Sequence, residues 1–315
     1  MTAVIHFGHY GAMLVRGSWV RSSVICTALL VAAAGCSGSG PDREAAGSRM
    51  DSVLEVPEGA ELLGAVFPGA QNGWPGSQEE TWDAVLVITG EDPVAVLKDL
   101  VAQAEESGFA LRSFSPESAA CGVLHESVLQ CQALTVRDDG SGSYEFNLQW
   151  GTFQGAGFSH VLVRRQSRAY DVPSGSVSFE TDLPPAPPSI DEWEGPEAGE
   201  PVAAPTDAFD TGGAVAILEP GGRVVGPPAH SWSLSGGYGV VVALDDGADA
   251  DQVVAAYAAQ FERFGFEGTV TGTTFEGNRA VAARYNGAGA GDLEAVVVED
   301  ANSGRSFLRL SRAND

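Results

Sequence analysis

The chain has 315 residues, which is room for about two domains of ordinary size. Its 42 acidic and 17 basic residues give a formal net charge of −25 at pH 7. A charge of this sign repels phosphate backbones and anionic lipid head groups, so we expect no nucleic-acid binding and no electrostatic docking to a membrane. The apolar content of 44% is enough for packed cores, so the chain is expected to be globular.

An apolar segment near the N-terminus predicts secretion. Residues 24–34 read VICTALLVAAA, preceded by Arg16 and Arg21 and followed by small residues. A positive segment, a short apolar core and a small-residue exit together form a secretory signal peptide, here over residues 1–35. A membrane-spanning helix is the weaker interpretation, because a span needs about 20 apolar residues.

The end of this segment, Ala33-Ala34-Gly35-Cys36, resembles the lipobox of bacterial lipoproteins, although alanine replaces the usual leucine at its first position. The resemblance implies that Cys36 is lipidated and that acyl chains hold the protein on the extracytoplasmic face of the cell membrane. An ordinary signal peptide with an incidental cysteine is the alternative. Residues 36–50 are rich in Gly and Ser, which predicts a flexible tether.

The first folded segment is expected to contain a buried strand, one helix and several hairpin strands. Residues 84–89 are a continuous apolar run, typical of a strand covered on both faces. Asp92 and Pro93 predict the start of a helix over residues 93–107, and Gly108 predicts its end. Strand-like runs follow at residues 110–113, 129–136, 144–150 and 160–164.

Loss of the leader would leave Cys121 and Cys131 as the cysteines other than Cys36. An oxidising compartment favours their pairing, so we predict a Cys121–Cys131 disulfide, with two free thiols as the alternative. A metal site is less favoured, because no further ligands stand at metal-ligand spacing. We expect neither a metal nor a cofactor.

Aromatic residues provide the candidate binding surface. Trp150, Phe153 and Phe158 lie in the Gly-rich sequence QWGTFQGAGF between two predicted strands. Exposed in a loop, such rings stack on sugar or peptide, whereas buried rings close the edge of a core. Trp193 is either packed on a neighbouring domain or an anchor for a partner protein.

Trp193 lies in a Pro-rich, acidic segment over residues 171–210, which we expect to be an extended linker. Beyond this linker a strand is predicted over residues 240–244 and a helix over residues 250–264, with Asp249 as its N-cap. Strand-like runs again follow, at residues 268–271, 280–285, 293–299 and 306–311.

The two halves can be aligned. Residues 82–109 match residues 239–266 without a gap, which sets Val85 against Val242, and downstream Gln132 is matched with Arg279. We interpret the match as an internal duplication, with chance similarity of two Ala/Val/Gly-rich segments as the alternative.

One helix followed by hairpin strands indicates the α+β class. We therefore predict two homologous domains, at residues 51–170 and 211–315, each an antiparallel or mixed sheet packed against one helix.

No local motif predicts catalysis. The sequence contains no GxSxG, and His125-Glu126 does not begin an HExxH site because Leu129 occupies the second histidine position. We therefore expect a lipid-anchored envelope protein that is not an enzyme and that binds or organises a protein or glycan partner. The alternative is a cell-envelope hydrolase, which would need inward carboxylates with shifted pKa values, or a Ser/His pair converging from distant positions.

Overall fold

The structure is a computed structural model, and its described residues belong to one compact unit, Gly40–Asp315. No helix among them is long and apolar enough to span a membrane. The predicted leader, Cys36 and Trp193 lie outside the described residues, which are 49–69, 81–90, 92–112, 121–125, 128–153, 156–167, 195–203, 214–226, 228–230, 237–275, 277–287, 291–301 and 303–313.

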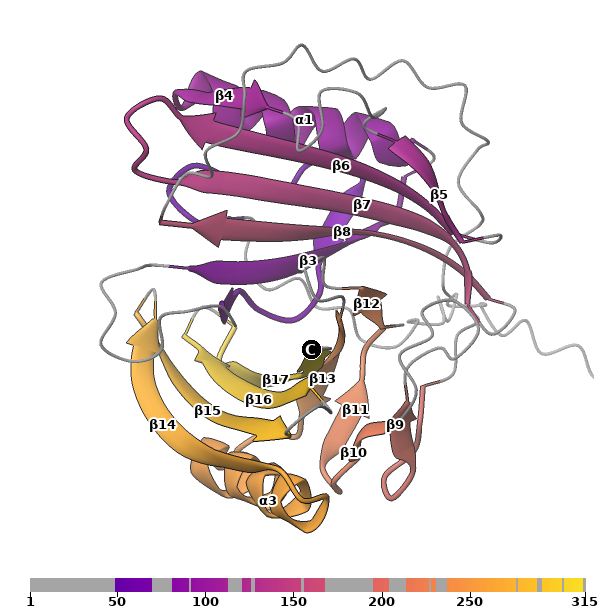
Figure 1. Ribbon diagram of the computed structural model, residues 1–315, viewed down its shortest axis with the longest axis vertical. Coiled ribbons are helices and arrows are strands. Elements are labelled where there is room, and N and C mark those ends of the chain that lie inside the picture. The colour runs from indigo at the N-terminus through magenta and orange to yellow at the C-terminus, as the bar shows by residue number, and fades with distance from the viewer. Residues whose placement is uncertain are drawn as a thin grey trace, which may run out of the picture. The chain divides into compact units, whose positions relative to one another are not determined.

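The first sheet has eight described strands, all paired antiparallel, and helix α1 (Pro93–Glu106) packs on one of its faces (Figure 1). The main strand order is β1 (Ala60–Leu62), β3 (Trp82–Ile88), β8 (Ala156–Gln166), β7 (Ser143–Phe153), β6 (Val128–Arg137) and β4 (Phe109–Arg112). In addition, β2 (Phe67–Pro68) pairs with β3, and β5 (Cys121–His125) pairs with β6.

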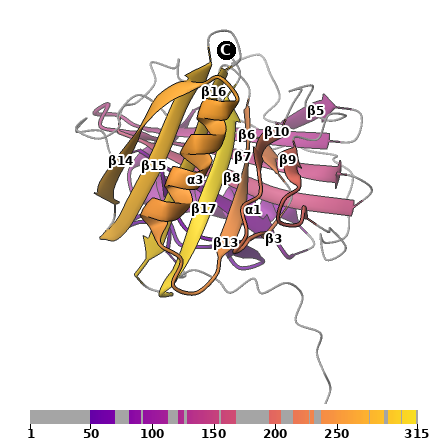
Figure 2. The same cartoon turned by 90° about the horizontal axis from the view of Figure 1, so that it is seen from below.

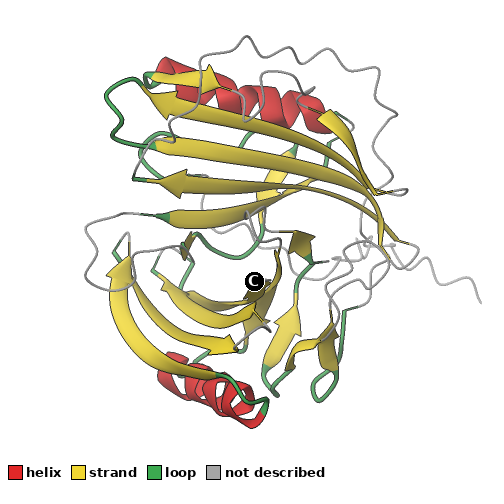
Figure 3. Ribbon diagram, viewed as in Figure 1, coloured by secondary structure: helices red, strands yellow, loops and turns green. Residues whose placement is uncertain are grey.

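The second sheet has seven described strands, also antiparallel, and helix α3 (Ala250–Arg263) packs on one of its faces (Figure 2). The main order is β11 (Gly222–Val224), β13 (Gly237–Leu244), β17 (Arg305–Ala313), β16 (Gly291–Asp300), β15 (Asn278–Gly287) and β14 (Glu267–Phe275), and β12 (Ala229–His230) pairs with β13. A separate two-stranded sheet joins β9 (Pro201–Ala203) to β10 (Ala214–Ile217). Strands dominate the structure (Figure 3), and the predicted α+β class is confirmed.

Both helices begin and end where the sequence predicts, to within a residue. The Asp92 carboxylate accepts a hydrogen bond from Ala95 N at 3.0 Å, and the Asp249 carboxylate accepts one from Asp251 N at 2.9 Å. Gly108 and Gly265 follow the two helices with φ of 87° and 88°, a left-handed conformation that favours glycine.

Three apolar clusters fill the interior. One lies between α1 and the first sheet, and a second lies between α3 and the second sheet. The third joins the remaining faces of the two sheets, with Val87 and Phe158 from the first and Val241 and Phe307 from the second. Strands β3 and β13 are therefore covered on both sides, which explains their continuous apolar runs.

The two sheets share one strand order, from the short edge strand at β1 and β11 to the opposite edge at β4 and β14. Register matches as well: Leu86 pairs with Val161 as Val242 pairs with Leu308, and all four side chains face a helix. Leu86 thus corresponds to Val242.

The gap-free alignment is wrong in the strands. It set Val85 against Val242, yet Val85 faces the other sheet and Val242 faces α3. The reason is loop length, since four positions separate Ile88 from Asp92 and five separate Leu244 from Asp249. A one-residue slip moves every side chain of a strand to the opposite face.

The downstream part of the alignment, which matched Gln132 with Arg279, is also wrong. Because Gln132 pairs with Asn147 as Ala282 pairs with Val296, Gln132 corresponds to Ala282, three positions beyond the predicted Arg279.

Two predicted domain limits also shift. Met50, expected at the end of the tether, is buried in the first core. Val202, expected in the linker, is buried in the second core because β9 pairs with β10. The linker predicted over residues 171–210 is therefore wrong for residues 201–203.

Candidate functional site

The predicted aromatic surface is not formed at two of its four positions. Trp150 is 1% exposed in the core beside α1, and Phe158 is 3% exposed in the core between the sheets. Strands β7 and β8 extend through the Gly-rich sequence that was expected to be a loop, so their side chains alternate between two covered faces. Phe153 lies at the end of β7, where its side chain is outside the description.

The predicted disulfide partners stand opposite each other. Cys121 in β5 and Cys131 in β6 are direct partners in the antiparallel register, and Cys131 is fully buried. Directly opposed residues have Cα atoms about 4.5–5.5 Å apart, within the range that a disulfide spans. The disulfide itself stays a prediction.

The face of the first sheet that looks away from α1 is unexpectedly polar. Four carboxamides on β6 and β7, which we call the carboxamide cluster, lie there in two register pairs: Gln130 with Gln149, and Gln132 with Asn147. His160 of β8 continues the row, opposite Gln149. Gln149 is 0% exposed and Asn147 is 4% exposed, so this polar face is covered.

The second sheet is apolar at every corresponding position. Gln149 corresponds to Val298 and Asn147 to Val296, because Leu148 pairs with Val161 as Val297 pairs with Leu308. By the same registers Gln130, Gln132 and His160 correspond to Ala280, Ala282 and Phe307, all of which belong to the apolar cluster between the sheets.

Several amide atoms of the cluster have no hydrogen-bond partner. Gln149 Nε2 donates to Asn147 Oδ1 at 3.5 Å, but Gln149 Oε1, Asn147 Nδ2 and Gln130 Oε1 are buried and unpaired. Each such atom costs roughly 1–3 kcal/mol, so native proteins rarely keep them without a bound water, ion or ligand. Three on one face mark this region as the candidate functional site.

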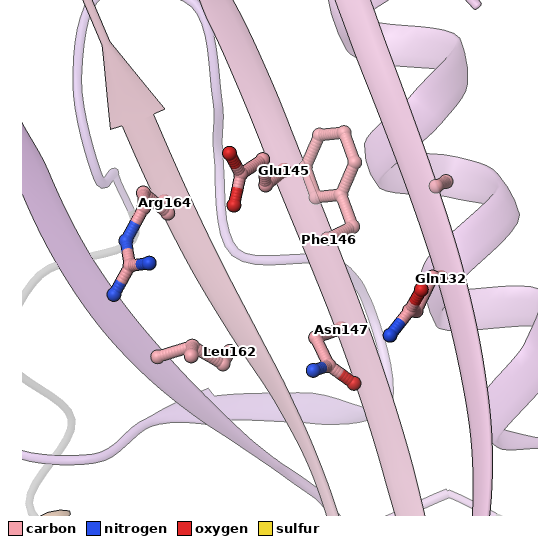
Figure 4. Close-up of a pocket in the computed structure, with 7 residues that line it drawn as sticks. Gln132, Glu145, Phe146, Asn147, Leu162 and Arg164 are labelled. Atoms are coloured by element: carbon pink, nitrogen blue, oxygen red, sulfur yellow. The ribbon is translucent and has the colours of Figure 1, made fainter. Parts of the chain in front are cut away.

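Figure 4 shows a small cavity beside the cluster, with lining residues on β6, β7 and β8. Gln132 and Asn147 line one side, and Glu145, Leu162 and Arg164 line the other. Its volume of about 10 Å³ is the space that one water molecule needs. The Glu145 carboxylate accepts a hydrogen bond from Gln166 Nε2 at 2.9 Å at this end of the polar face.

A chain of charges, buried except for the half-buried Arg284, connects the polar face to the second sheet. Arg164 Nε donates to Asp83 Oδ1 at 2.7 Å, and Arg309 Nη1 of the second sheet donates to Asp83 Oδ2 at 3.0 Å. Arg309 Nη2 donates to Glu294 Oε2 at 2.6 Å, and Arg284 Nε donates to Glu294 Oε1 at 2.6 Å. We call these five residues the intersheet network.

The network also holds backbone of the first half against the second sheet. Arg309 Nη2 donates to the Pro68 carbonyl at 3.0 Å, and Arg284 Nη2 donates to the Gly69 carbonyl at 2.8 Å. A cavity of about 50 Å³ lies beside the network, walled mainly by apolar side chains such as Leu63 and Val241.

Two of the inward carboxylates, Asp83 and Glu294, are therefore engaged in ion pairs. Both oxygens of Asp83 and both oxygens of Glu294 accept hydrogen bonds from guanidinium groups. A general base needs an oxygen that is free to take a proton from substrate. These contacts are those of a structural connection between sheets, and they do not favour the hydrolase alternative.

Sequence reasoning missed the carboxamide cluster, although a signal exists. Gln130 and Gln132 alternate with buried residues, as do Glu145, Asn147 and Gln149, and this period of two predicts a polar face. The intersheet network has no such signal, because Asp83 and Arg309 are 226 positions apart.

Comparison of the chain with models of known protein families, with curated proteins and with solved structures gives no match. The function is therefore inferred from the side chains and their arrangement.

Proposed function

We propose that this protein is anchored by lipid to the extracytoplasmic face of the cell membrane and binds a partner there without catalysis. The proposed anchor is Cys36, at the end of the signal-like segment. We further propose that two homologous α+β domains arose by duplication. The shared strand order and the corresponding registers of the two sheets support this origin.

The binding role rests on the carboxamide cluster. After a duplication, the apolar face of the second sheet is the simplest arrangement, since it needs no hydrogen-bond partners. The first sheet instead carries buried amides with unpaired atoms, which lowers stability and thus calls for a compensating use. Because Gln149 and Asn147 are covered in this structure, the proposed binding requires the cover of this face to move aside. The amides, which both donate and accept, would then suit the neutral polar groups of a peptide backbone or a glycan.

Partner capture tests this role. Intact cells carrying the wild type or the double variant Asn147→Val/Gln149→Val would be treated with a crosslinker, and the partners purified and counted by mass spectrometry. We expect the double variant to lose the partner while its circular dichroism stays that of the wild type.

A matched control removes an exposed carboxamide from the second sheet. Asn286→Val should leave partner recovery unchanged, because Asn286 is exposed and its amide bonds only to Asp292 among the described residues. Equal recovery from the double variant and the wild type would refute a binding role for the cluster.

Anchoring is tested separately. Cys36→Ser should release the protein from the membrane fraction into the soluble fraction, and the wild-type N-terminal peptide should carry the mass of a diacylglycerol. A Cys36→Ser protein that still fractionates with membranes would contradict the lipid anchor.

A further inference from the structure

The far edge of the second sheet is a long strand. Strand β14 is the last strand of its sheet (Figure 2), and no other described strand pairs with its outer side. It pairs with β15 over nine consecutive positions, from Glu267 to Phe275, without a shift of register. Six of its nine residues are exposed, and an exposed edge strand is a template for pairing with another strand.

The corresponding edge of the first sheet is built differently. There the edge is divided between β4, with four residues, and β5, with five residues. Short edge strands, bulges, lysine and proline are the usual protection against pairing between molecules. Strand β14 has none of these features, and Glu267 is its only charged residue.

Two large apolar side chains of the second half are exposed. Phe264, at the end of α3, is 47% exposed, and Val270, in the middle of β14, is 46% exposed. They are the large apolar side chains that the described part of the chain leaves exposed. Val270 pairs with Ala283, whose side chain is in the α3 core, so Val270 lies on the helix-covered side of the sheet.

The sequence of β14 matches itself in the antiparallel direction. Residues Gly268 to Gly272 read GTVTG, which is a palindrome centred on Val270. We propose that β14 pairs antiparallel with β14 of a second copy of this chain, around a twofold axis at Val270. Such an isologous contact sets each surface against itself, so a self-matching strand fits it.

The proposed pairing places compatible residues opposite each other on both faces of the strand. Val270 meets Val270 of the other copy, and Thr269 meets Thr271, so β-branched side chains stand opposite each other. Glu267 meets Thr273, so no like charges are opposed despite the acidic chain. Two strands alone form a small interface, below the roughly 1,200 Å² of stable complexes, so the dimer should be reversible and depend on concentration.

Sedimentation velocity on the full-length chain tests the proposal over a hundredfold range of concentration. The wild type should shift from monomer toward dimer as concentration rises. Val270→Lys and Val270→Glu should each raise the dissociation constant at least tenfold, because two like charges would face each other at the axis. An equimolar mixture of the two variants should dimerise again.

The control adds the same charge at the end of the strand. Thr274→Lys should dimerise much as the wild type does, because position 274 lies outside the palindrome and faces no like charge. A wild type that stays monomeric at the highest concentration, a Val270→Lys variant that dimerises normally, or a mixture that stays monomeric would each overturn the proposal.

Cysteine crosslinking tests the register. Val270→Cys should give an oxidised dimer on a non-reducing gel, since directly opposed residues are within disulfide range. Thr269→Cys should give little oxidised dimer, because residue 269 lies opposite Thr271 and the two new cysteines are therefore diagonal to each other. Equal dimer from both variants would show random collision and refute pairing centred on Val270.

Discussion

The two sheets share a framework and differ in the faces that they turn inward. On the helix side both are apolar at corresponding positions, such as Leu86 and Val242. On the other side the second sheet carries Val298 where the first carries Gln149. The helix-facing core is thus common to the two sheets, whereas the opposite face is apolar in one sheet and polar in the other.

The difference also explains how the halves are joined. Glu294 and Glu145 occupy corresponding positions, since Glu294 pairs with Ser311 as Glu145 pairs with Arg164. The second sheet places Arg309 beside Glu294, whereas the first has Leu162 at that position. One sheet thus supplies the arginine that crosses to Asp83 of the other.

The largest effect on the free energy of unfolding is expected from replacing Arg309 by leucine, the residue at the corresponding position 162 of the first sheet. Arg309→Leu would leave Asp83 and Glu294 buried with one guanidinium donor fewer each. Removal of one partner from a buried ion pair costs about 3–5 kcal/mol, so the free energy of unfolding should fall by that amount in urea denaturation.

Arg279 provides the matched control, because its ion pairs with Asp251 and Glu299 are exposed. Arg279→Leu should cost less than about 1 kcal/mol. Similar losses from the two variants would mean that the intersheet network has no special weight.

The next largest effect on the free energy of unfolding is expected from the predicted Cys121–Cys131 disulfide at the divided edge of the first sheet. If Cys121 and Cys131 are joined, the bridge closes a short loop and contributes roughly 2–3 kcal/mol. A reductant should then lower the free energy of unfolding of the wild type by this amount and leave a Cys121→Ser variant unaffected. Alkylation of both cysteines in the unreduced, unfolded protein would contradict the disulfide.

The ionisation of Tyr257 in the second core should make the free energy of unfolding depend on pH by about the same amount. Burial raises the pKa of Tyr257 to about 12 from its usual 10, while its hydroxyl accepts a hydrogen bond from Glu219 N at 3.1 Å. The unfolded state loses this proton first, so the free energy of unfolding should be level below pH 10 and fall by roughly 2–3 kcal/mol toward pH 12.

The corresponding titration in the first core needs to be separated from that of Tyr257. Burial and the nearby Asp51 carboxylate raise the pKa of Tyr144 as well. The difference between the wild type and Tyr257→Phe across pH 10–12 isolates Tyr257. A difference that does not change with pH would show that Tyr257 ionises equally in both states.

The smallest effect is a gain in stability. The double variant Asn147→Val/Gln149→Val gives the first sheet the residues of the second, and it removes two unpaired buried amide atoms together with the one hydrogen bond between these side chains. The free energy of unfolding should rise by about 1–2 kcal/mol, measured by urea denaturation. The reverse exchange, Val298→Gln, should lower it, and a loss of stability in the double variant would instead indicate that ordered water satisfies the amides.

Local signals in the sequence predicted much of the fold. Capping aspartates, the glycines after each helix and the apolar runs before them determine where α1 and α3 begin and end, because these interactions lie within a few residues. Strand-like runs separated by turn residues predicted the hairpin strands for the same reason. The cysteine count in the sequence also selected Cys121 and Cys131, and the strand register places them opposite each other.

Only the tertiary structure decided which face each strand residue takes and what covers it. One extra residue before Asp249 shifts the strand correspondence, and the extension of β7 and β8 buries Trp150 and Phe158. Asp83 meets Arg309 because two sheets pack face to face, an arrangement that no local pattern encodes. Burial and pairing between distant strands depend on the whole fold, whereas caps and turns depend on their neighbours.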